Sequence, residues 1–359
     1  VVYSNLIRRT FKKTPIILGG IEASLRRMAH YDYWSDKVKR SILMDSGADL
    51  LSYGMGEHSI LAVAEALDSG LAVEDIVFIP GTVYKCRMEK VSCYEPIWLP
   101  SYEEICESKE KYAESFMKQY ENTDPFTAKP LVEVYPNKMA VVQNPPSMPL
   151  TTQEMDDIYD YPYVGTYHPS YEKEGGVPSI QEVEFSITHN RGCFGACNFC
   201  AIAFHQGREI TARSEASVLR EAKTLTEMPN FKGYIHDVGG PTANFRSLSC
   251  DKQIKHGLCK AKKCLAPTPC KLLKVDHSEY LHMLRKLRAV PKVKKVFIRS
   301  GIRYDYLMQD TDESFFKELV QHHVSGQLKV APEHCSANVL DHMGKPHIEA
   351  YKAFQKRFY

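Results

Sequence analysis

The sequence lacks any long apolar run: no stretch approaches the roughly 18 to 20 consecutive apolar residues that a membrane-spanning helix needs. Its amino terminus also lacks the charged-then-apolar layout of a signal peptide. The formal net charge is only +2 over 359 residues, so the charge balance gives no argument for binding nucleic acid or an anionic membrane surface. From these absences we expect a cytoplasmic protein with no membrane partner.

The eleven cysteines are unsuited to a disulfide framework. Their number is odd, and seven of them lie between Cys193 and Cys270 in a chain of 359 residues. Clustered thiols in a cytosolic protein more often bind metal or perform redox chemistry. The cysteines therefore direct attention to the second half of the chain.

The first part of the chain alternates short strand-like and helix-like patterns. "TPIILGG" and "ADLLSYGMGE" are apolar runs that end in glycine, and "HSILAVAEALDSG" places four apolar residues on one helical stripe. This order predicts part of a parallel sheet in residues 1–71. Residues 72–180 are rich in proline and tyrosine and show little periodicity, which predicts a linker and packing segment.

Residues 181–359 show a second pattern of strands and helices. Strand-like runs occur at "EFSITHN", "GYIHDVGG", "VKKVFIRSG" and "GQLKVAPEH", with apolar residues at helical spacing between them. This predicts four strands of a parallel sheet or barrel, with functional groups at the carboxyl ends of the strands. Because the sequence begins with Val1 and stops at Tyr359 within a helix-like run, we expect a fragment lacking both ends and an incomplete barrel.

Three cysteines follow the first of these strands in the pattern C-x3-C-x2-C, namely Cys193, Cys197 and Cys200. A structural zinc site and an electron-transfer [4Fe–4S] cluster ordinarily use four protein ligands, whereas three thiolates leave one iron open. An open iron can chelate a small molecule. The alternatives are three unrelated cysteines, or a zinc site completed by His205.

This spacing, with Phe199 just before the last cysteine, resembles the signature of radical S-adenosylmethionine (SAM) enzymes. The resemblance implies that Cys193, Cys197 and Cys200 ligate a [4Fe–4S] cluster whose open iron binds SAM. It also implies that SAM is cleaved, after transfer of one electron, to methionine and a 5′-deoxyadenosyl radical. The electron would come from a donor such as flavodoxin or ferredoxin.

The later strand ends carry groups suited to SAM. "DVGGPTAN" provides Gly239 and Gly240 in the place of the "GGE" segment that receives the methionine amino group, although a proline stands where that motif has glutamate. The next strand ends in Ser300 and Arg303, which suit a carboxylate or ribose hydroxyls, and the one after it ends in Glu333. We expect these five residues to bind the cofactor, the alternative for each being a loop cap or a surface ion pair.

Four longer motifs, "IILGGIEASLRRMAHYDYWSD", "GGPTAN", "SGIRYD" and "LKVAPEH", together resemble the YgiQ family of radical SAM proteins over nearly the whole chain. The resemblance implies an α/β fold, in which a partial parallel (β/α) barrel of the radical SAM type follows part of a Rossmann-like domain of the cobalamin-binding type. The cobalt-ligating histidine loop of such domains belongs earlier than residue 1, so cobalamin is not supported by this sequence. The substrate and the reaction outcome stay open.

Two other functions fit parts of the sequence. "VLDHMGKPH" resembles a segment of the methylthiotransferases, radical SAM enzymes that modify tRNA or a ribosomal protein, although neither their RNA-binding module nor their auxiliary cysteine set is visible. From another class, the chain would be a non-catalytic binding module that is stabilised by metal. SAM cleavage by the reduced protein distinguishes this module from an enzyme.

Residues 246–274 form a Cys-rich and Lys-rich insert that has little apolar periodicity. Its four cysteines are too many for core packing to explain in so short a segment. Four thiolates are enough for a zinc site or a second iron–sulfur cluster, and either would order the loop. We therefore predict a second metal site, against the alternative of free surface thiols, at Cys250, Cys259, Cys264 and Cys270.

Overall fold

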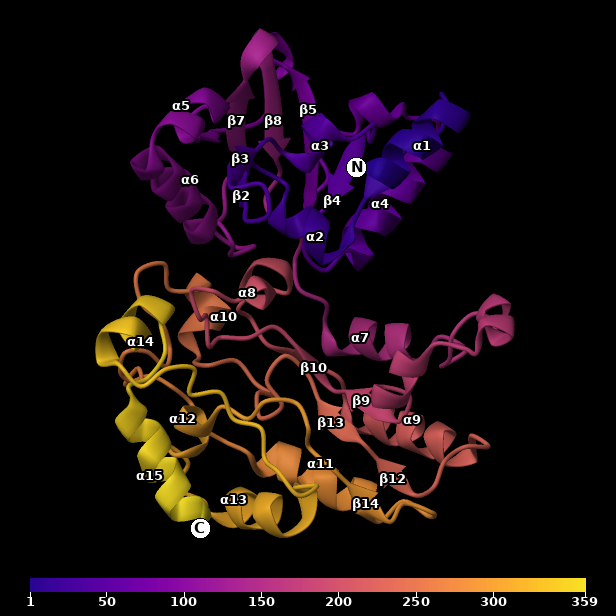
Figure 1. Cartoon of the computed structure of the whole chain (residues 1–359), viewed down its shortest axis with the longest axis vertical. Coiled ribbons are helices and arrows are strands. Elements are labelled where there is room, and N and C mark those ends of the chain that lie inside the picture. The colour runs from indigo at the N-terminus through magenta and orange to yellow at the C-terminus, as the bar shows by residue number, and fades with distance from the viewer. The chain divides into compact units, whose positions relative to one another are not determined.

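The chain divides into two compact units in a computed structural model that describes residues 1–359 (Figure 1). Unit 1 comprises Val1–Pro149, Cys200–Gly207 and His256–Lys260. Unit 2 comprises the remaining segments, Leu150–Phe199, Arg208–Lys255 and Ala261–Tyr359. None of the helices has the length and apolar composition needed to cross a membrane.

Unit 1 is built on a six-stranded mixed sheet with the strand order β1-β4-β5-β8-β7-β6. The pairs β1/β4 and β6/β7 are parallel, and the three pairs between them are antiparallel. The strands are β1 (Ile17–Leu18), β4 (Leu50–Ser52), β5 (Thr82–Arg87), β6 (Ile97–Trp98), β7 (Leu131–Tyr135) and β8 (Met139–Gln143).

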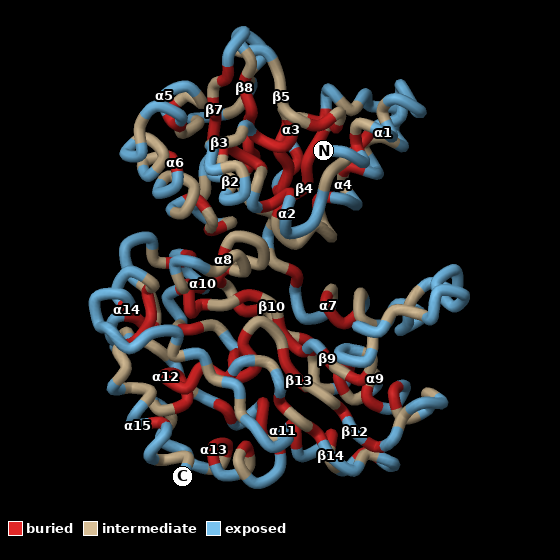
Figure 2. Tube along the Cα trace, in the orientation of Figure 1, coloured by how far each residue is buried: buried red, intermediate tan, exposed pale blue.

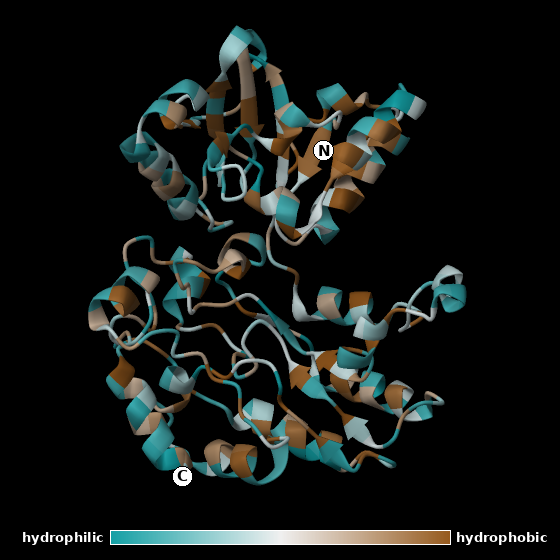
Figure 3. Ribbon diagram, in the orientation of Figure 1, coloured by the Kyte–Doolittle hydropathy of each residue, from teal (hydrophilic) through white to brown (hydrophobic).

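Both faces of this sheet are buried, because neighbouring apolar residues on a strand point to opposite sides. On β4, Leu50 belongs to one core cluster and Leu51 to the other. The first cluster is covered by α4 through Val63, and the second by α2 and α3 through Ala23 and Leu43. Figures 2 and 3 show β4, β7 and β8 as largely buried and hydrophobic.

The helices of unit 1 flank this sheet. Several begin with a side-chain cap: Ser101 and Glu104 form a capping box at α5, and the Ser108 hydroxyl accepts from the backbone N–H of Lys111 in the first turn of α6. The helices are α1 (Val2–Thr10), α2 (Gly20–Leu25), α3 (Ile42–Asp45), α4 (Glu57–Asp68), α5 (Tyr102–Glu107), α6 (Lys109–Glu121) and α8 (Ala201–His205), and β2 (His30–Asp32) with β3 (Lys37–Lys39) makes a separate hairpin.

The predicted division into a first domain of residues 1–71 and a linker of residues 72–180 is wrong for most of its length. The parallel pairing predicted early in the chain is confirmed as β1 with β4. However, β5, β7 and β8 lie within the predicted linker and form the centre of the same sheet. Their runs "TVYKCR", "LVEVY" and "MAVVQ" are apolar enough to be buried on both faces, so they pack as core strands despite the proline-rich stretches around them.

Unit 2 contains three extended segments that run parallel. The first is β9 (Ser186–Thr188), the second carries β12 (Tyr234–Ile235) and β13 (Asp237–Gly239), and the third begins as β14 (Lys295–Val296). Backbone hydrogen bonds link β9 to β13 and β12 to β14. Just after β14, the N–H of Phe297 donates to the Ile235 carbonyl, and the Phe297 carbonyl accepts from the N–H of Val238. A short antiparallel pair, β10 (Asn190–Arg191) with β11 (Thr211–Ala212), follows β9.

Helices pack along these strands, as Figure 1 shows for α9 and α11. Their apolar faces meet Ile187, Val238 and Val296 of the strands in one core cluster. The arrangement is an α/β fold, as predicted. The remaining helices are α7 (Thr152–Tyr159), α9 (Glu215–Glu227), α10 (Lys252–His256), α11 (Ser278–Arg288), α12 (Tyr304–Leu307), α13 (Ser314–Glu318), α14 (Ala337–Met343) and α15 (Ile348–Phe358).

The fourth predicted strand, "GQLKVAPEH", is not a strand in the structure. Residues 326–334 have no partner in any sheet, although Leu328 and Val330 pack against the core of unit 2. Alternating apolar and polar residues favour an extended chain, but a strand also needs a neighbour with free backbone groups. The strands of unit 2 consequently do not close a barrel.

Candidate functional site

The cysteine loop begins directly after β9 and β10, as the sequence predicts. The β10/β11 pair closes its base, and Gly192 is essential to that closure. Gly192 has a φ of +81°, and a Cβ at this position would lie 1.8 Å from the carbonyl oxygen of Glu209. Only glycine fits so close to a neighbouring backbone. The backbone of the loop therefore sets its direction independently of any ligand.

Cys193 is held in the interior of unit 2. Its Sγ lies 3.3 Å from Oγ1 of Thr242, in the loop that follows β13. The next residue, Phe194, is buried and stacks on Phe245 at 3.7 Å between ring centroids. Burial raises the pKa of the Cys193 thiol, while the Thr242 hydroxyl and the Arg303 guanidinium act in the opposite direction.

Arg303 is the cation that contacts this loop. Its Nη1 lies 3.5 Å from Sγ of Cys197, and its Nε and Nη2 donate to the two oxygens of Asp305 at 2.7 and 2.6 Å. Gly195 admits the guanidinium, since a Cβ there would lie 2.4 Å from Nη1 and 3.3 Å from Sγ of Cys193. Burial would lower the pKa of Arg303, but Asp305 and the two thiols outweigh it and raise that pKa.

Two lysines add to the positive charge around Cys197. The side chain of Lys345 is buried, and its Nζ is 4.0 Å from Oε1 of Glu333. Nζ of Lys263 donates to Asn198, the residue after Cys197. Burial lowers the pKa of both lysines, and the nearby guanidinium of Arg303 lowers each further. Of these cations, Arg303 is paired with Asp305 and Lys345 lies near Glu333, whereas Lys263 is only partly buried.

Cys200 precedes α8 and is grouped with unit 1, whereas Cys193 and Cys197 belong to unit 2. The chain itself keeps Cys200 within about 11 Å of Cys197, because three residue steps of extended backbone reach no farther. All three thiols are free. The alternative zinc ligand His205 is held through Nδ1 at 2.9 Å from Oγ of Ser24.

Most of the residues predicted to contact SAM already contact other protein atoms. A Cβ at Gly239 would meet Ser300 at 2.2 Å, and one at Gly240 would meet Asn190 at 2.0 Å, so each glycine accommodates protein atoms. The Ser300 hydroxyl donates to Asp237. Glu333 differs, because its side chain is one-third exposed and its only ion pair is the 4.0 Å contact with Lys345.

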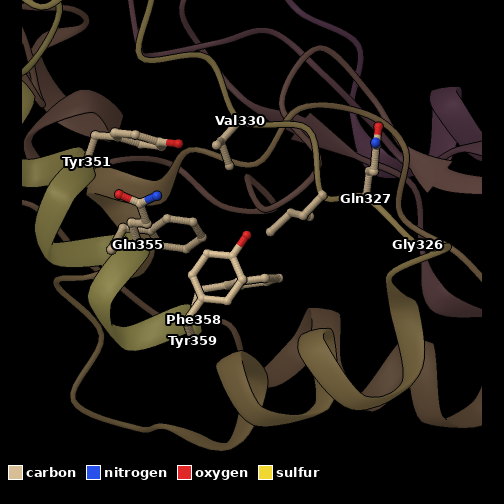
Figure 4. Close-up of a pocket in the computed structure, with 9 residues that line it drawn as sticks. Gly326, Gln327, Val330, Tyr351, Gln355, Phe358 and Tyr359 are labelled. Atoms are coloured by element: carbon tan, nitrogen blue, oxygen red, sulfur yellow. The ribbon is translucent and has the colours of Figure 1, made fainter.

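A cavity of about 490 Å³ adjoins the cysteine loop within unit 2, in the size range of small-molecule sites. Asn198 belongs to its lining, with Lys262, Lys263 and Lys345. A second cavity, of about 260 Å³, lies between residues 326–330 and α15. Figure 4 shows Tyr351, Gln355 and Phe358 projecting from α15 around it, and it contains no predicted site residue.

The predicted second metal site, at Cys250, Cys259, Cys264 and Cys270, stays a prediction. No group of three or more His, Cys, Asp or Glu side chains is arranged to hold a metal ion, either in the insert or at Cys193, Cys197 and Cys200. Packing divides the insert: Cys259 lies in a segment grouped with unit 1, and the other three cysteines belong to unit 2. Hydrogen bonds fix parts of the insert, including Cys264 Sγ to Ser249 Oγ at 3.2 Å and the long-range bond from Leu258 N to Asp124 at 2.9 Å.

Sequence reasoning missed three groups at the cysteine loop: Thr242, Lys263 and Lys345. Thr242 stands two residues after the diglycine, in a motif where only the two glycines were expected to have a role. Lys345 lies in "HMGKPH", where the lysine gives no sign that it will be buried. The contacts of Thr242 and Lys263 join residues 49 or more positions apart, so only the folded chain reveals them.

The chain matches known proteins over its full length. The family model described as "Radical SAM N-terminal" matches residues 1–186. A UPF0313 protein of Clostridium botulinum (strain Okra) is 56% identical over 359 residues, and one of Clostridium perfringens (strain ATCC 13124) is 55% identical. Each alignment covers 100% of this chain but 56% and 54% of the relative, so the chain spans about half the length of these relatives.

Two solved structures also resemble this chain. Both are of TsrM, a radical SAM methyltransferase from Kitasatospora setae. One, with tryptophan substrate and a SAM analogue bound, has a TM-score of 0.48 at 16% identity and covers 98% of this chain and 48% of its own. The other, with cobalamin and a [4Fe–4S] cluster bound, has a TM-score of 0.49 at 14% identity and covers 99% and 49%.

Proposed function

The chain belongs to the UPF0313 (YgiQ-like) family of radical SAM proteins, and from this premise we propose that it reductively cleaves SAM at a [4Fe–4S] cluster ligated by Cys193, Cys197 and Cys200. The observation that supports the proposal best is the contact of a buried guanidinium, that of Arg303, with the cysteine loop. A closed cluster or a structural zinc would need a fourth protein ligand, and the motif offers three.

The residues present fit such a cluster by their chemistry. The three cysteines are free thiols within eight residues of chain. Arg303, Lys263 and Lys345 supply the positive charge that a cluster with three thiolates would offset. When bound, the cluster supplies one electron to SAM, which separates into methionine and a 5′-deoxyadenosyl radical able to abstract hydrogen from a substrate.

The chain's own residues have separate tasks in this proposal. Thr242 fixes the Cys193 sulfur, and Asp305 fixes the guanidinium that contacts Cys197. The buried aromatic pair Phe194 and Phe245 keeps water from the base of the loop. These groups set the position and charge of the site before the reaction begins.

Among the predicted SAM contacts, we assign the ammonium group of the methionine moiety to Glu333. Its carboxylate is the predicted group least engaged by protein, whereas Ser300 is bonded to Asp237 and Arg303 to Asp305. For Gly239 and Gly240 we propose contacts through backbone atoms alone. Both residues lie so close to neighbouring side chains that a Cβ would clash with them. The electron donor is proposed to be a flavodoxin or a ferredoxin.

The substrate is proposed to occupy the cavity beside Asn198. Three lysines, Lys262, Lys263 and Lys345, and one carboxylate, that of Asp341, lie along its wall, and the excess of positive charge favours a substrate that carries a negative group.

The test is SAM cleavage by the anaerobically reconstituted chain with a strong chemical reductant. We expect 5′-deoxyadenosine and methionine in equal amounts, and we expect Cys197→Ala to abolish both. Cys335→Ala is the matched control, because Cys335 is exposed and outside the motif. Iron-loaded protein that forms no 5′-deoxyadenosine would favour the non-catalytic metal-stabilised module, whereas a Cys197→Ala variant that still forms it would overturn the assignment of Cys197 as a cluster ligand.

A further inference from the structure

Unit 1 contains a buried guanidinium with no acidic partner. Arg27 is 3% exposed, its Nε donates to Oε1 of Gln143 at 2.7 Å, and its Nη1 donates to the carbonyl of Ser24. The rings of Tyr53 and Phe204 lie 4.9 and 5.8 Å from its central carbon. Every one of these partners is neutral. Burial lowers the pKa of Arg27, and no ion pair offsets the free-energy cost of burying its charge.

This guanidinium lines a cavity of about 110 Å³ that lies wholly within unit 1. For comparison, a cavity of about 150 Å³ accommodates benzene. The space therefore suits a ligand of a few non-hydrogen atoms. Phe116 and Phe204 form an apolar part of the wall, with their ring centroids 5.3 Å apart.

Two further polar groups line the same cavity. His30 bonds the Met28 carbonyl through Nδ1 at 3.1 Å, and its Nε2 is buried without a partner. Burial lowers the pKa of His30, so the ring is neutral with its proton on Nδ1 and an acceptor lone pair on Nε2. The Ser115 hydroxyl is 2% exposed and accepts from Gln119 at 3.2 Å, which leaves its own proton to donate.

We infer that this cavity binds a small 2-hydroxycarboxylate. The carboxylate accepts hydrogen bonds from Arg27 and Ser115 and supplies the charge that the guanidinium lacks. The ligand hydroxyl donates to Nε2 of His30, and the short carbon body lies against the two phenylalanine rings. Nε2 of His30, which is buried without a partner, gains a donor, and the Arg27 guanidinium gains an anion. This site is independent of the proposed SAM chemistry, because none of its residues belongs to the cysteine motif.

Glycolate and propionate are the matched probes, since they have the same number of non-hydrogen atoms and only glycolate carries the hydroxyl. Calorimetric titration of the full chain should show glycolate binding several-fold more tightly than propionate. Arg27→Gln should weaken glycolate about tenfold or more. Arg26→Gln is the control, because its guanidinium pairs with Glu22 and Asp32.

Two more variants keep the inference testable if Arg27→Gln fails to fold. His30→Phe should bind both probes equally, because it removes the Nε2 acceptor on which the discrimination depends; it also removes the Nδ1 bond to the Met28 carbonyl, which faces no ligand in this proposal. Ser115→Leu should fill the cavity and abolish binding of both probes while leaving Arg27 in place. Equal affinity of the unaltered chain for both probes, undiminished binding by Ser115→Leu, or no heat of binding at all would overturn the inference and leave ordered water as the occupant.

Discussion

Arg303 shows how one side chain can serve two partners at a site. Its Nε and Nη2 are taken by Asp305, so the direction of Nη1 toward Cys197 is fixed rather than chosen among rotamers. A lysine could carry the charge but not this geometry, because it has one rotatable ammonium in place of a planar fork. The guanidinium is therefore suited to stabilise added negative charge at the loop.

We expect Arg303→Gln to lower the reduction potential of the reconstituted cluster. Loss of one charge a few ångströms away, at an effective dielectric constant of about 20, corresponds to a shift on the order of 100 mV. Redox titration followed by electron paramagnetic resonance would measure it, with Arg299→Gln as control because Arg299 is exposed and pairs with Glu182. An unchanged potential at full iron content would contradict the role given to Arg303.

Glu133 is a second buried charge, at the centre of the unit 1 sheet. Its Oε1 accepts from the Ala29 backbone at 2.8 Å and from the Tyr135 hydroxyl, while Oε2 has no partner. Burial raises the pKa of Glu133 from 4.5 to about 7. The folded chain thus holds this proton more tightly than the unfolded chain, so the stabilisation is complete below pH 4.5 and is lost as pH rises through about 7.

Unit 1 should therefore lose stability between about pH 4 and pH 8, by about 3 kcal/mol if this carboxyl acts alone. Glu133→Gln resembles the protonated form, and we expect it to flatten the dependence of the urea midpoint on pH over that range. Glu65→Gln, on the exposed side of α4, should retain the slope. A slope that persists in Glu133→Gln would assign the titration to another group.

At the scale of elements, Gly192 determines whether the β10/β11 pair can close. Gly192→Ala places a methyl group 1.8 Å from a backbone oxygen at a φ of +81°, and neither partner can rotate away. We expect a loss of about 3 kcal/mol or more in unfolding free energy. Gly207→Ala is the control, because Gly207 has a φ of +82° but nothing within 4 Å, so its cost should be about 1 kcal/mol.

The elements also show what the sequence could and could not predict. The parallel β1/β4 pair and the strand before the cysteine loop were accessible, because short apolar runs that end in glycine or polar turns mark them. The β7/β8 hairpin was missed. Its turn, Pro136–Lys138, uses positive φ at Asn137 and Lys138, and the surrounding prolines and tyrosines concealed this signal.

At the candidate site, too, the sequence revealed the local features but not the long-range contacts. The spacing of Cys193, Cys197 and Cys200 is local, so the order of the amino acids is enough to reveal it. The contact between Cys197 and Arg303 joins residues 106 positions apart, and the burial of Lys345 depends on packing of the whole unit. Four cysteines in the insert suggested metal because of their number, but number alone does not bring thiols together.

At the scale of the whole molecule, each unit has its own hydrophobic core. Unit 1 is held by the two clusters on the faces of its sheet, and unit 2 by a large cluster between its parallel strands and helices and a smaller one beside the cysteine loop. Segments that leave one unit and pack in the other, such as residues 200–207, are short. Separate cores of this kind commonly unfold separately.

We therefore expect two calorimetric transitions from the full chain. Leu51→Ala and Leu284→Ala form a matched pair, because both leucines are fully buried, the first in unit 1 and the second in unit 2. Each should destabilise its own unit by about 3 kcal/mol and leave the other midpoint unchanged, since a cavity acts on the core that contains it. A single transition that both substitutions lower equally would show instead that the two cores fold as one cooperative structure.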